Sequence, residues 1–164
     1  MKKIGKAFDK LESALKYACI FLTAGYTILT FVQVIMRYAL SSPLWWSEQV
    51  ARYMFIWTIM LFAPVILRSG NNLGFDLFLK KMPHRVQAIF GIVAMSLICA
   101  FGALYCDYSV QFLIKTIHKT IPGLKIPYWT VYSSEVVGAF LITLFALEIV
   151  INDIIRMRAE KKGE

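Results

Sequence analysis

Four long apolar stretches separated by short polar segments account for most of the chain. The first runs from Tyr17 to Met36 without a charged residue, and the second closes with an uncharged run from Tyr53 to Leu67. Such stretches are long enough to cross the hydrocarbon core of a bilayer as α-helix. We therefore expect an all-α integral membrane protein with a single four-helix domain over 1–164. The expected transmembrane helices cover about 17–40, 43–67, 84–115 and 126–156.

Shorter patterns predict how these elements begin and what flanks them. Ser42 suits an N-cap and Pro43 suits a first helical position, so the second helix is expected to begin there. Ahead of the first span, apolar residues recur at helical spacing among lysines, which predicts an amphipathic interfacial helix over 1–16. A similar pattern before Pro83 predicts a second interfacial helix. The apolar positions are Ile4, Phe8, Leu11 and Leu15 in the first segment and Phe75, Phe78, Leu79 and Met82 in the second.

The composition excludes a soluble domain and the charge distribution indicates an orientation. The chain has 164 residues, is 59% hydrophobic and only 17% charged, and has a formal net charge of +8. The basic residues lie at the ends of the apolar runs, which argues against a nucleic-acid-binding face. Five precede the first span, four separate the second from the third and four follow the fourth, against five on the other side. By the positive-inside rule, both termini are expected to be cytoplasmic.

Aromatic residues agree with this orientation. Two tryptophans precede the second span, and a Tyr-Trp pair opens the fourth. All four would lie together at the outer membrane surface, where aromatic side chains commonly anchor helices. We expect these interfacial anchors to be Trp45, Trp46, Tyr128 and Trp129.

The sequence contains no motif for a cofactor, a metal or a nucleophile. Its three cysteines lie in apolar spans, where a cysteine is usually a small buried hydrophobic residue. The two histidines, His84 and His118, lie near expected span ends, so haem held between transmembrane histidines is poorly supported. No glycine-rich phosphate loop or zinc-binding pair of histidines is present. We expect a protein that is not an enzyme and has no cofactor.

Charged residues within or beside the spans are the candidate structural or partner-interface residues. Glu48 and Arg52 are spaced i, i+4 at the start of the second span, and three more charges lie toward the same outer third of the membrane. They are predicted either to form a paired or solvated seam that arranges the helices or receives a partner, or to reach the headgroups one by one. The central turns of the spans carry no charge, which favours an auxiliary subunit over a self-sufficient pump. The five candidates are Arg37, Glu48, Arg52, Asp107 and Glu135.

Several blocks in the middle of the chain resemble one family. They are Gln33 to Tyr38, then Pro43 with Trp46 to Arg52 and Trp57, then Arg68 to Asp76, and also Lys125 to Trp129. In order and spacing these blocks resemble the small membrane subunit, the DctQ-like or Q component, of tripartite ATP-independent periplasmic (TRAP) transporters. The chain departs from the family pattern at Phe62, Asn72 and Val136. Besides Arg37 and the Glu48 block, the residues that carry the resemblance are Gln33, Tyr38, Pro43, Trp57, Arg68, Gly70 and Asp76.

The resemblance implies a non-catalytic, multi-pass subunit of the bacterial inner membrane, surrounded by phospholipid. Its partners would be a large multi-span M subunit, which binds sodium and substrate and works as an elevator, and a periplasmic P protein that delivers an organic acid such as a dicarboxylate or sialic acid. The small subunit would be a scaffold for the large one. Two alternatives stay open. One is an independent small transporter or channel, as a homo-oligomer with a pore lined by Gln33, Thr58 and Ser96, and the other is a membrane anchor of a redox complex.

Overall fold

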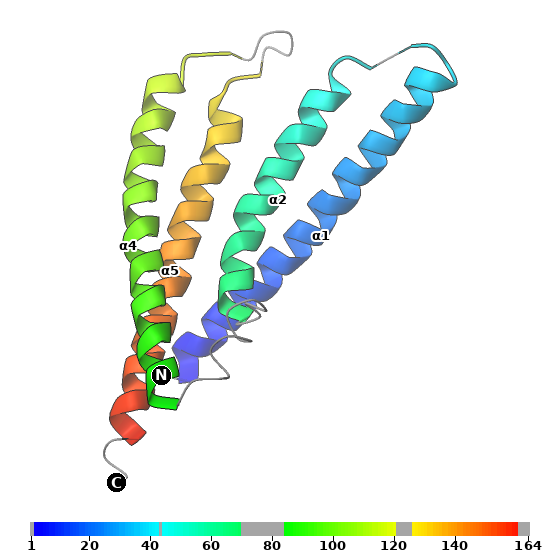
Figure 1. The fold of residues 1–164 in the computed structure, drawn as a ribbon. Helices are drawn as coiled ribbons and strands as arrows, with labels where there is room; N and C mark the ends of the chain where they lie inside the picture. The colour runs from blue at the N-terminus through cyan, green and yellow to red at the C-terminus, as the bar shows by residue number, and fades with distance from the viewer. Residues whose placement is uncertain (1, 43, 70–83, 121–125, 161–164) are drawn as a thin grey trace.

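Four long helices make up the part of the chain that the structure describes (Figure 1). The computed structural model describes residues 2–42, 44–69, 84–120 and 126–160. The helices are α1 (Lys2–Tyr38), α2 (Ser47–Ser69), α4 (His84–Thr116) and α5 (Trp129–Glu160). Each is long and apolar enough to cross a membrane, which confirms the expected four-span, all-α architecture. The predicted interfacial helix near Phe75 lies outside the described residues, as do Pro43, Gly70 and Asp76.

The N-terminal segment does not form a separate helix. Residues 2–38 are one continuous helix of 37 residues, about 55 Å long at 1.5 Å per residue, which exceeds the ~30 Å hydrocarbon thickness. Part of the apolar face predicted to lie on the membrane packs on protein, because Leu15 is buried and Phe8 contacts Phe145 of α5, whereas Leu11 is 36% exposed. This corrects the predicted boundary at residue 16.

The second helix begins later than Ser42 and Pro43 suggested. Leu44 starts a turn in which the Ser47 backbone N–H and hydroxyl both donate to its carbonyl, at 3.2 and 2.7 Å. Trp45 and Trp46 lie in this turn rather than in the helix. Ser47 is fully buried and begins α2, and the negative charge of Glu48 in the first turn interacts favourably with the helix dipole. This corrects the predicted start to Ser47.

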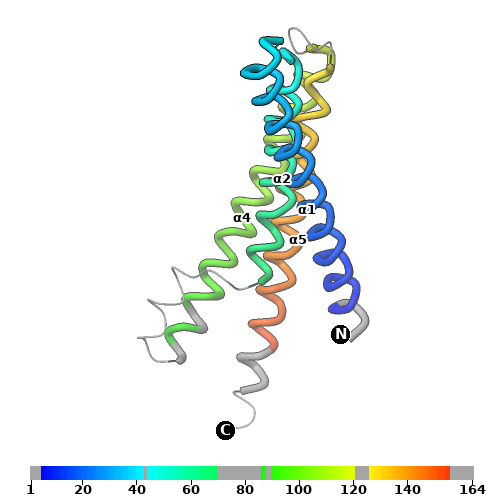
Figure 2. The backbone as a smooth tube through the Cα atoms, turned by 90° about the vertical axis from the view of Figure 1, so that its right-hand side faces the viewer, coloured from blue at the N-terminus to red at the C-terminus, as the bar shows by residue number. Residues whose placement is uncertain are grey.

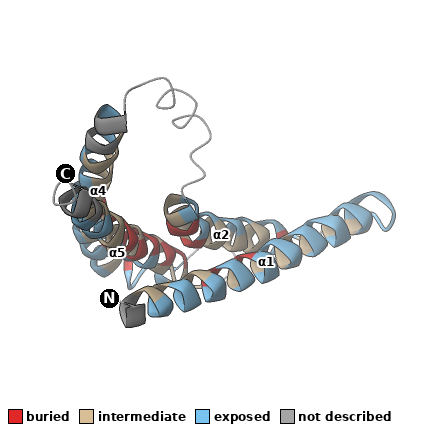
Figure 3. Ribbon diagram, turned by 90° about the horizontal axis from the view of Figure 1, so that it is seen from below, coloured by how far each residue is buried: buried red, intermediate tan, exposed pale blue. Residues whose placement is uncertain are grey.

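The helices lie side by side in an open row rather than in a closed bundle. Extensive contacts join α1 to α2, α2 to α5 and α5 to α4, so α1 and α4 occupy the two ends (Figure 1; Figure 3, seen from below). The beginning of α1 and the end of α5 lie at the same end of the molecule (Figures 1 and 2). We call this the inner end, and the end formed by Tyr38, Ser47, Thr116 and Trp129 the outer end. The row leaves large apolar faces uncovered.

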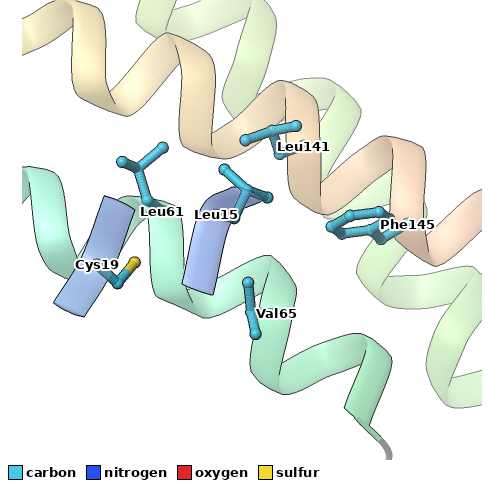
Figure 4. Close-up of a cluster of buried hydrophobic side chains, with 6 residues drawn as sticks. All are labelled: Leu15, Cys19, Leu61, Val65, Leu141 and Phe145. Atoms are coloured by element: carbon cyan, nitrogen blue, oxygen red, sulfur yellow. The ribbon is translucent and has the colours of Figure 1, made fainter. Parts of the chain in front are cut away.

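The core lies toward the inner half, where three helices meet. Leu15 and Cys19 of α1 pack against Leu61 and Val65 of α2 and against Leu141 and Phe145 of α5 (Figure 4). The Cys19 sulfur lies 3.8 Å from the Thr58 carbonyl oxygen, which places the buried thiol between α1 and α2.

Small residues allow close approach along the rest of the row. On α4, Gly102, Ser109 and Thr116 recur every seven residues and face α5 as buried positions. On α5, a Cβ added to Gly138 would lie 2.9 Å from the backbone oxygen of Met60 in α2. Membrane helices commonly associate through such small residues, because apolar burial alone does not favour protein over lipid.

Candidate functional site

The most connected polar group of the described residues centres on Arg68, in the last turn of α2. Its guanidinium donates to Glu148 of α5 from Nε at 3.0 Å and to Glu12 of α1 from Nη1 at 2.5 Å. Nη2 reaches Asp9 of α1 at 2.7 Å. We call these four residues the Arg68 cluster. One side chain thereby ties α1, α2 and α5 together at the inner end.

The environment of the Arg68 cluster strengthens these interactions. The side chains of Arg68, Glu12 and Glu148 are only 14%, 16% and 11% exposed. The Arg68 guanidinium carbon also lies 5.9 Å from the ring centre of Phe8 and 5.7 Å from that of Phe145. Ion pairs are screened less in such surroundings, and planar guanidinium suits both carboxylates and aromatic faces. The arrangement holds helices together rather than offering a free reactive group.

Sequence reasoning singled out Arg68 only through the family resemblance and missed its three carboxylate partners. Glu12 also accepts from Lys16, at 2.6 Å on its own helix. The sequence did show that Arg68 and Glu148 both lie at the inner ends of apolar spans, where an isolated charge is costly and a partner of opposite charge is favoured. This pattern places the two charges at one depth, but it does not show that they pair.

The five outer charged candidates are not joined into one network. Glu48 and Arg52 pair with each other on α2 at 3.4 Å, with side chains 63% and 58% exposed. Asp107 on α4 accepts from Gln111 at 2.8 Å, and Arg37 is exposed in the last turn of α1. Glu135 of α5 lines a cavity shared with α4. Only Glu48 and Arg52 are brought together.

The predicted aromatic anchors and one motif residue lie toward the outer end. Trp45 is 67% exposed and Trp129 is 46% exposed, while Trp46 is 38% exposed and Tyr128 is partly covered. Trp57 has a different role, because its indole N–H donates at 3.0 Å to the Thr130 carbonyl and links α2 to the first turn of α5. The remaining described motif residues, Gln33 and Tyr38, lie on the outer half of α1, half-buried and exposed respectively.

The two helices at the ends of the row each present a stripe of large apolar side chains. Their spacing of three and four residues is typical of helix-packing surfaces. Lipid and a partner helix are equally apolar, so the pattern suits either neighbour. The α1 stripe consists of Tyr17, Phe21, Ile28, Phe31, Ile35 and Tyr38, and the α4 stripe of Phe90, Val93, Leu97, Phe101, Leu104 and Tyr108.

Among the described residues, no group of three or more His, Cys, Asp or Glu side chains is placed to hold a metal ion. The residues expected to line a pore lie apart within a single chain. Gln33 lies on α1 and Ser96 on α4, at opposite ends of the row, while the Thr58 hydroxyl donates to the Met54 carbonyl of its own helix.

These features define the class: an integral membrane protein whose four described helices stand in a row, three of them joined by the Arg68 cluster. Residues 26–156 match the family described as tripartite ATP-independent periplasmic transporters, DctQ component. The chain belongs to this family. It is therefore a multi-pass small permease subunit of a TRAP transporter in the bacterial inner membrane, and not an enzyme.

Named relatives agree with this assignment. The chain is 26% identical over 146 residues to a TRAP transporter small permease protein of Haemophilus influenzae, covering 88% of this chain and 89% of the relative. It is 23% identical over 171 residues to the C4-dicarboxylate TRAP transporter small permease protein DctQ of Vibrio cholerae, covering 90% and 72%. It is also 28% identical over 118 residues to the isethionate TRAP transporter permease protein DctMQ of Oleidesulfovibrio alaskensis, covering 70% of this chain but 18% of that protein.

Proposed function

We propose that this subunit is a scaffold that holds a large multi-span M subunit in the bilayer during sodium-coupled uptake of an organic acid. The open row of helices carries the proposal. It leaves apolar stripes on both end helices, while the inner ends of α1, α2 and α5 are fixed by the Arg68 cluster. A rigid body with broad uncovered faces suits the support of a moving partner.

The relatives' names support a large partner and an anionic substrate. In the isethionate transporter permease DctMQ, the segment similar to this chain occupies 18% of the protein, which leaves room for a much larger membrane part. Other relatives are named for C4-dicarboxylate and for sialic acid. We propose that sodium and substrate bind to the large subunit, that a periplasmic P protein delivers the substrate, and that both termini of this chain are cytoplasmic.

The test is uptake by purified subunits in liposomes. We expect sodium-driven accumulation of the organic acid when this chain, the large subunit of the same transporter and the P protein are present together. Omission of this chain should abolish uptake. Uptake by this chain alone would contradict the scaffold role, and so would full uptake by the large subunit and P protein without it.

Three of the five outer charged candidates remain proposed interface residues. Arg37, Glu48 and Arg52 are exposed, so they are available to a partner. We expect Glu48→Ala to reduce co-purification of the large subunit more than Lys161→Ala does. Equal recovery with both variants would indicate that the outer charges of α2 only contact headgroups.

A further inference from the structure

A cavity of about 550 Å³ lies between the outer halves of α4 and α5. Its wall includes Tyr105, Tyr108, Ser109 and Phe112 of α4 and Tyr132 and Glu135 of α5. Glu135 follows Trp129 by six residues, about 9 Å along the helix, and so lies below the aromatic anchors at hydrocarbon depth. The deep end of the cavity, at Glu135, therefore lies at hydrocarbon depth, while Lys115 lines its outer end.

One acidic group in this cavity lacks an ion-pair partner within the described part of the chain. The Glu135 carboxylate forms no ion pair with the described residues, in contrast to Glu12, Glu48 and Glu148. The Ser109 side chain, 4% exposed, lies beside Tyr105 in the cavity wall. An isolated carboxylate at this depth is unfavourable. The carboxylate accepts hydrogen bonds and therefore suits a cationic donor.

The aromatic wall favours the same kind of ligand. Phe112 and Tyr132 meet edge to face with ring centres 4.8 Å apart, and Tyr132 stacks on Tyr128 at 5.8 Å. Tyr105 and Tyr108 complete the wall on the α4 side. The faces of aromatic rings attract guanidinium and ammonium groups, most strongly away from water. A carboxylate within aromatic walls is therefore a site for an arginine or lysine side chain.

The chain's own lysine in this cavity does not satisfy Glu135. Lys115 lines the cavity, but it is in the last turn of α4 and its ammonium is not within ion-pair distance of the carboxylate. It lies six residues beyond Ser109, about 9 Å nearer the outer surface. A lipid amine would be held at that same headgroup level. A cation at the depth of Glu135 is best supplied by a neighbouring transmembrane helix.

We propose that this cavity receives an arginine or lysine side chain of the large subunit, and that the α4 stripe beside it forms the docking face. Tyr108 belongs to both the cavity wall and the α4 stripe, so the ion site and the exposed apolar surface are continuous. The inference rests on the proposed function, since it assumes that a large membrane partner exists. The inference specifies that the partner covers the α4 side of the row and that the Glu135 carboxylate binds its cation.

Asp107 provides a matched control. It lies at a similar depth on α4, but it lines a different cavity with Val110 of α4 and Phe140 of α5. Relative to Ser109, which faces α5, Asp107 and Val110 lie on the opposite side of the helix from Tyr105 and Phe112. Asp107→Asn therefore makes the same carboxylate-to-amide change beside a different cavity.

The experiment is co-purification of the tagged large subunit with Glu135→Gln and Asp107→Asn variants. We expect Glu135→Gln to reduce recovery at least about tenfold, because an unpaired cation is left in the partner, and Asp107→Asn to match the unaltered chain. Thermal unfolding of the Glu135→Gln chain alone is the control that tests whether this variant still folds. Unchanged recovery with Glu135→Gln would overturn this inference but leave the scaffold role intact. Failure of the unaltered chain to recover the large subunit would overturn both.

Photocrosslinking gives a second measurement that does not depend on stability. A benzophenone amino acid is introduced as Tyr108→p-benzoylphenylalanine or, on the other face, as Val110→p-benzoylphenylalanine. We expect position 108 to crosslink to the large subunit and position 110 not to. Crosslinking from position 110 alone, or capture of phospholipid rather than protein at position 108 in the assembled complex, would overturn the inference.

Discussion

Replacement of Arg68 by alanine tests whether the ion cluster at the inner end holds the helices together. The substitution removes the hydrogen bonds to Asp9, Glu12 and Glu148 and leaves two carboxylates that are less than one-fifth exposed. Removal of one partner from a buried ion pair typically costs about 3–5 kcal/mol. Lys16 still pairs with Glu12, so we expect a destabilisation near the lower end, about 3 kcal/mol.

The buried thiol of Cys19 provides the assay. It is 5% exposed and lies between α1 and α2, so a thiol-reactive fluorescent dye labels it only when these helices separate. Cys99 and Cys106 are first replaced by alanine so that Cys19 alone reports. For a chain of this size about 3 kcal/mol corresponds to a shift on the order of 10 °C, and we expect Arg68→Ala to lower the labelling midpoint by that amount.

Arg52→Ala is the matched control for Arg68→Ala. The Arg52 pair with Glu48 is exposed on both sides, so its loss should change stability by less than about 1 kcal/mol. Arg68→Lys keeps the charge but not the planar fork, and we expect an intermediate midpoint. If Arg68→Ala and Arg52→Ala unfold at the same temperature, the Arg68 cluster does not stabilise the fold and the reasoning fails.

Two further predictions concern the contacts of α2 with α5. Gly138→Ala should lower the Cys19 labelling midpoint by the equivalent of about 1–3 kcal/mol, because the added Cβ would meet the Met60 backbone. Gly91→Ala is the control, since a Cβ there has nothing within 4 Å and should not lower the midpoint. Equal midpoints for the two variants would contradict the close approach of α5 to α2. Trp57→Phe should destabilise the fold by about 1 kcal/mol, because it removes the hydrogen bond to the Thr130 carbonyl. Trp45→Phe, at an exposed position, should have no measurable effect on stability. A similar loss of stability in both variants would mean that the Trp57 indole N–H does not link the helices.

The number and approximate extent of the helices were predictable because uncharged apolar runs of this length have few alternatives in a bilayer. The third predicted span, 84–115, differs from α4 (His84–Thr116) by one residue at its end. The predicted helix boundaries were wrong where the local sequence pattern and the packing of the helices favour different limits. The lysine-rich segment before residue 17 resembles a surface helix, but Phe8 and Leu15 find partners on other helices and the backbone continues without a break.

The arrangement of the helices and the partners of Arg68 were not predictable. Membrane helices are apolar toward lipid and toward protein, so hydrophobic periodicity does not identify the packed face. The charges of Arg68, Glu12 and Glu148 lie on three different helices, and their meeting depends on the register of each helix against the next. The same limit applies to Glu135, whose depth follows from its position in the sequence but whose cavity follows from the packing of α4 on α5.

The central place of α5 in the row has a consequence for biogenesis. Among the described helices, the last to be synthesised is the one against which both α2 and α4 make their extensive contacts. During synthesis, the hairpin of α1 and α2 is complete early, while α4 enters the membrane before its main neighbour exists. The growing chain therefore passes through a stage in which α4 lacks its main neighbour, and a stop codon before Trp129 would leave α4 as a target for membrane quality control.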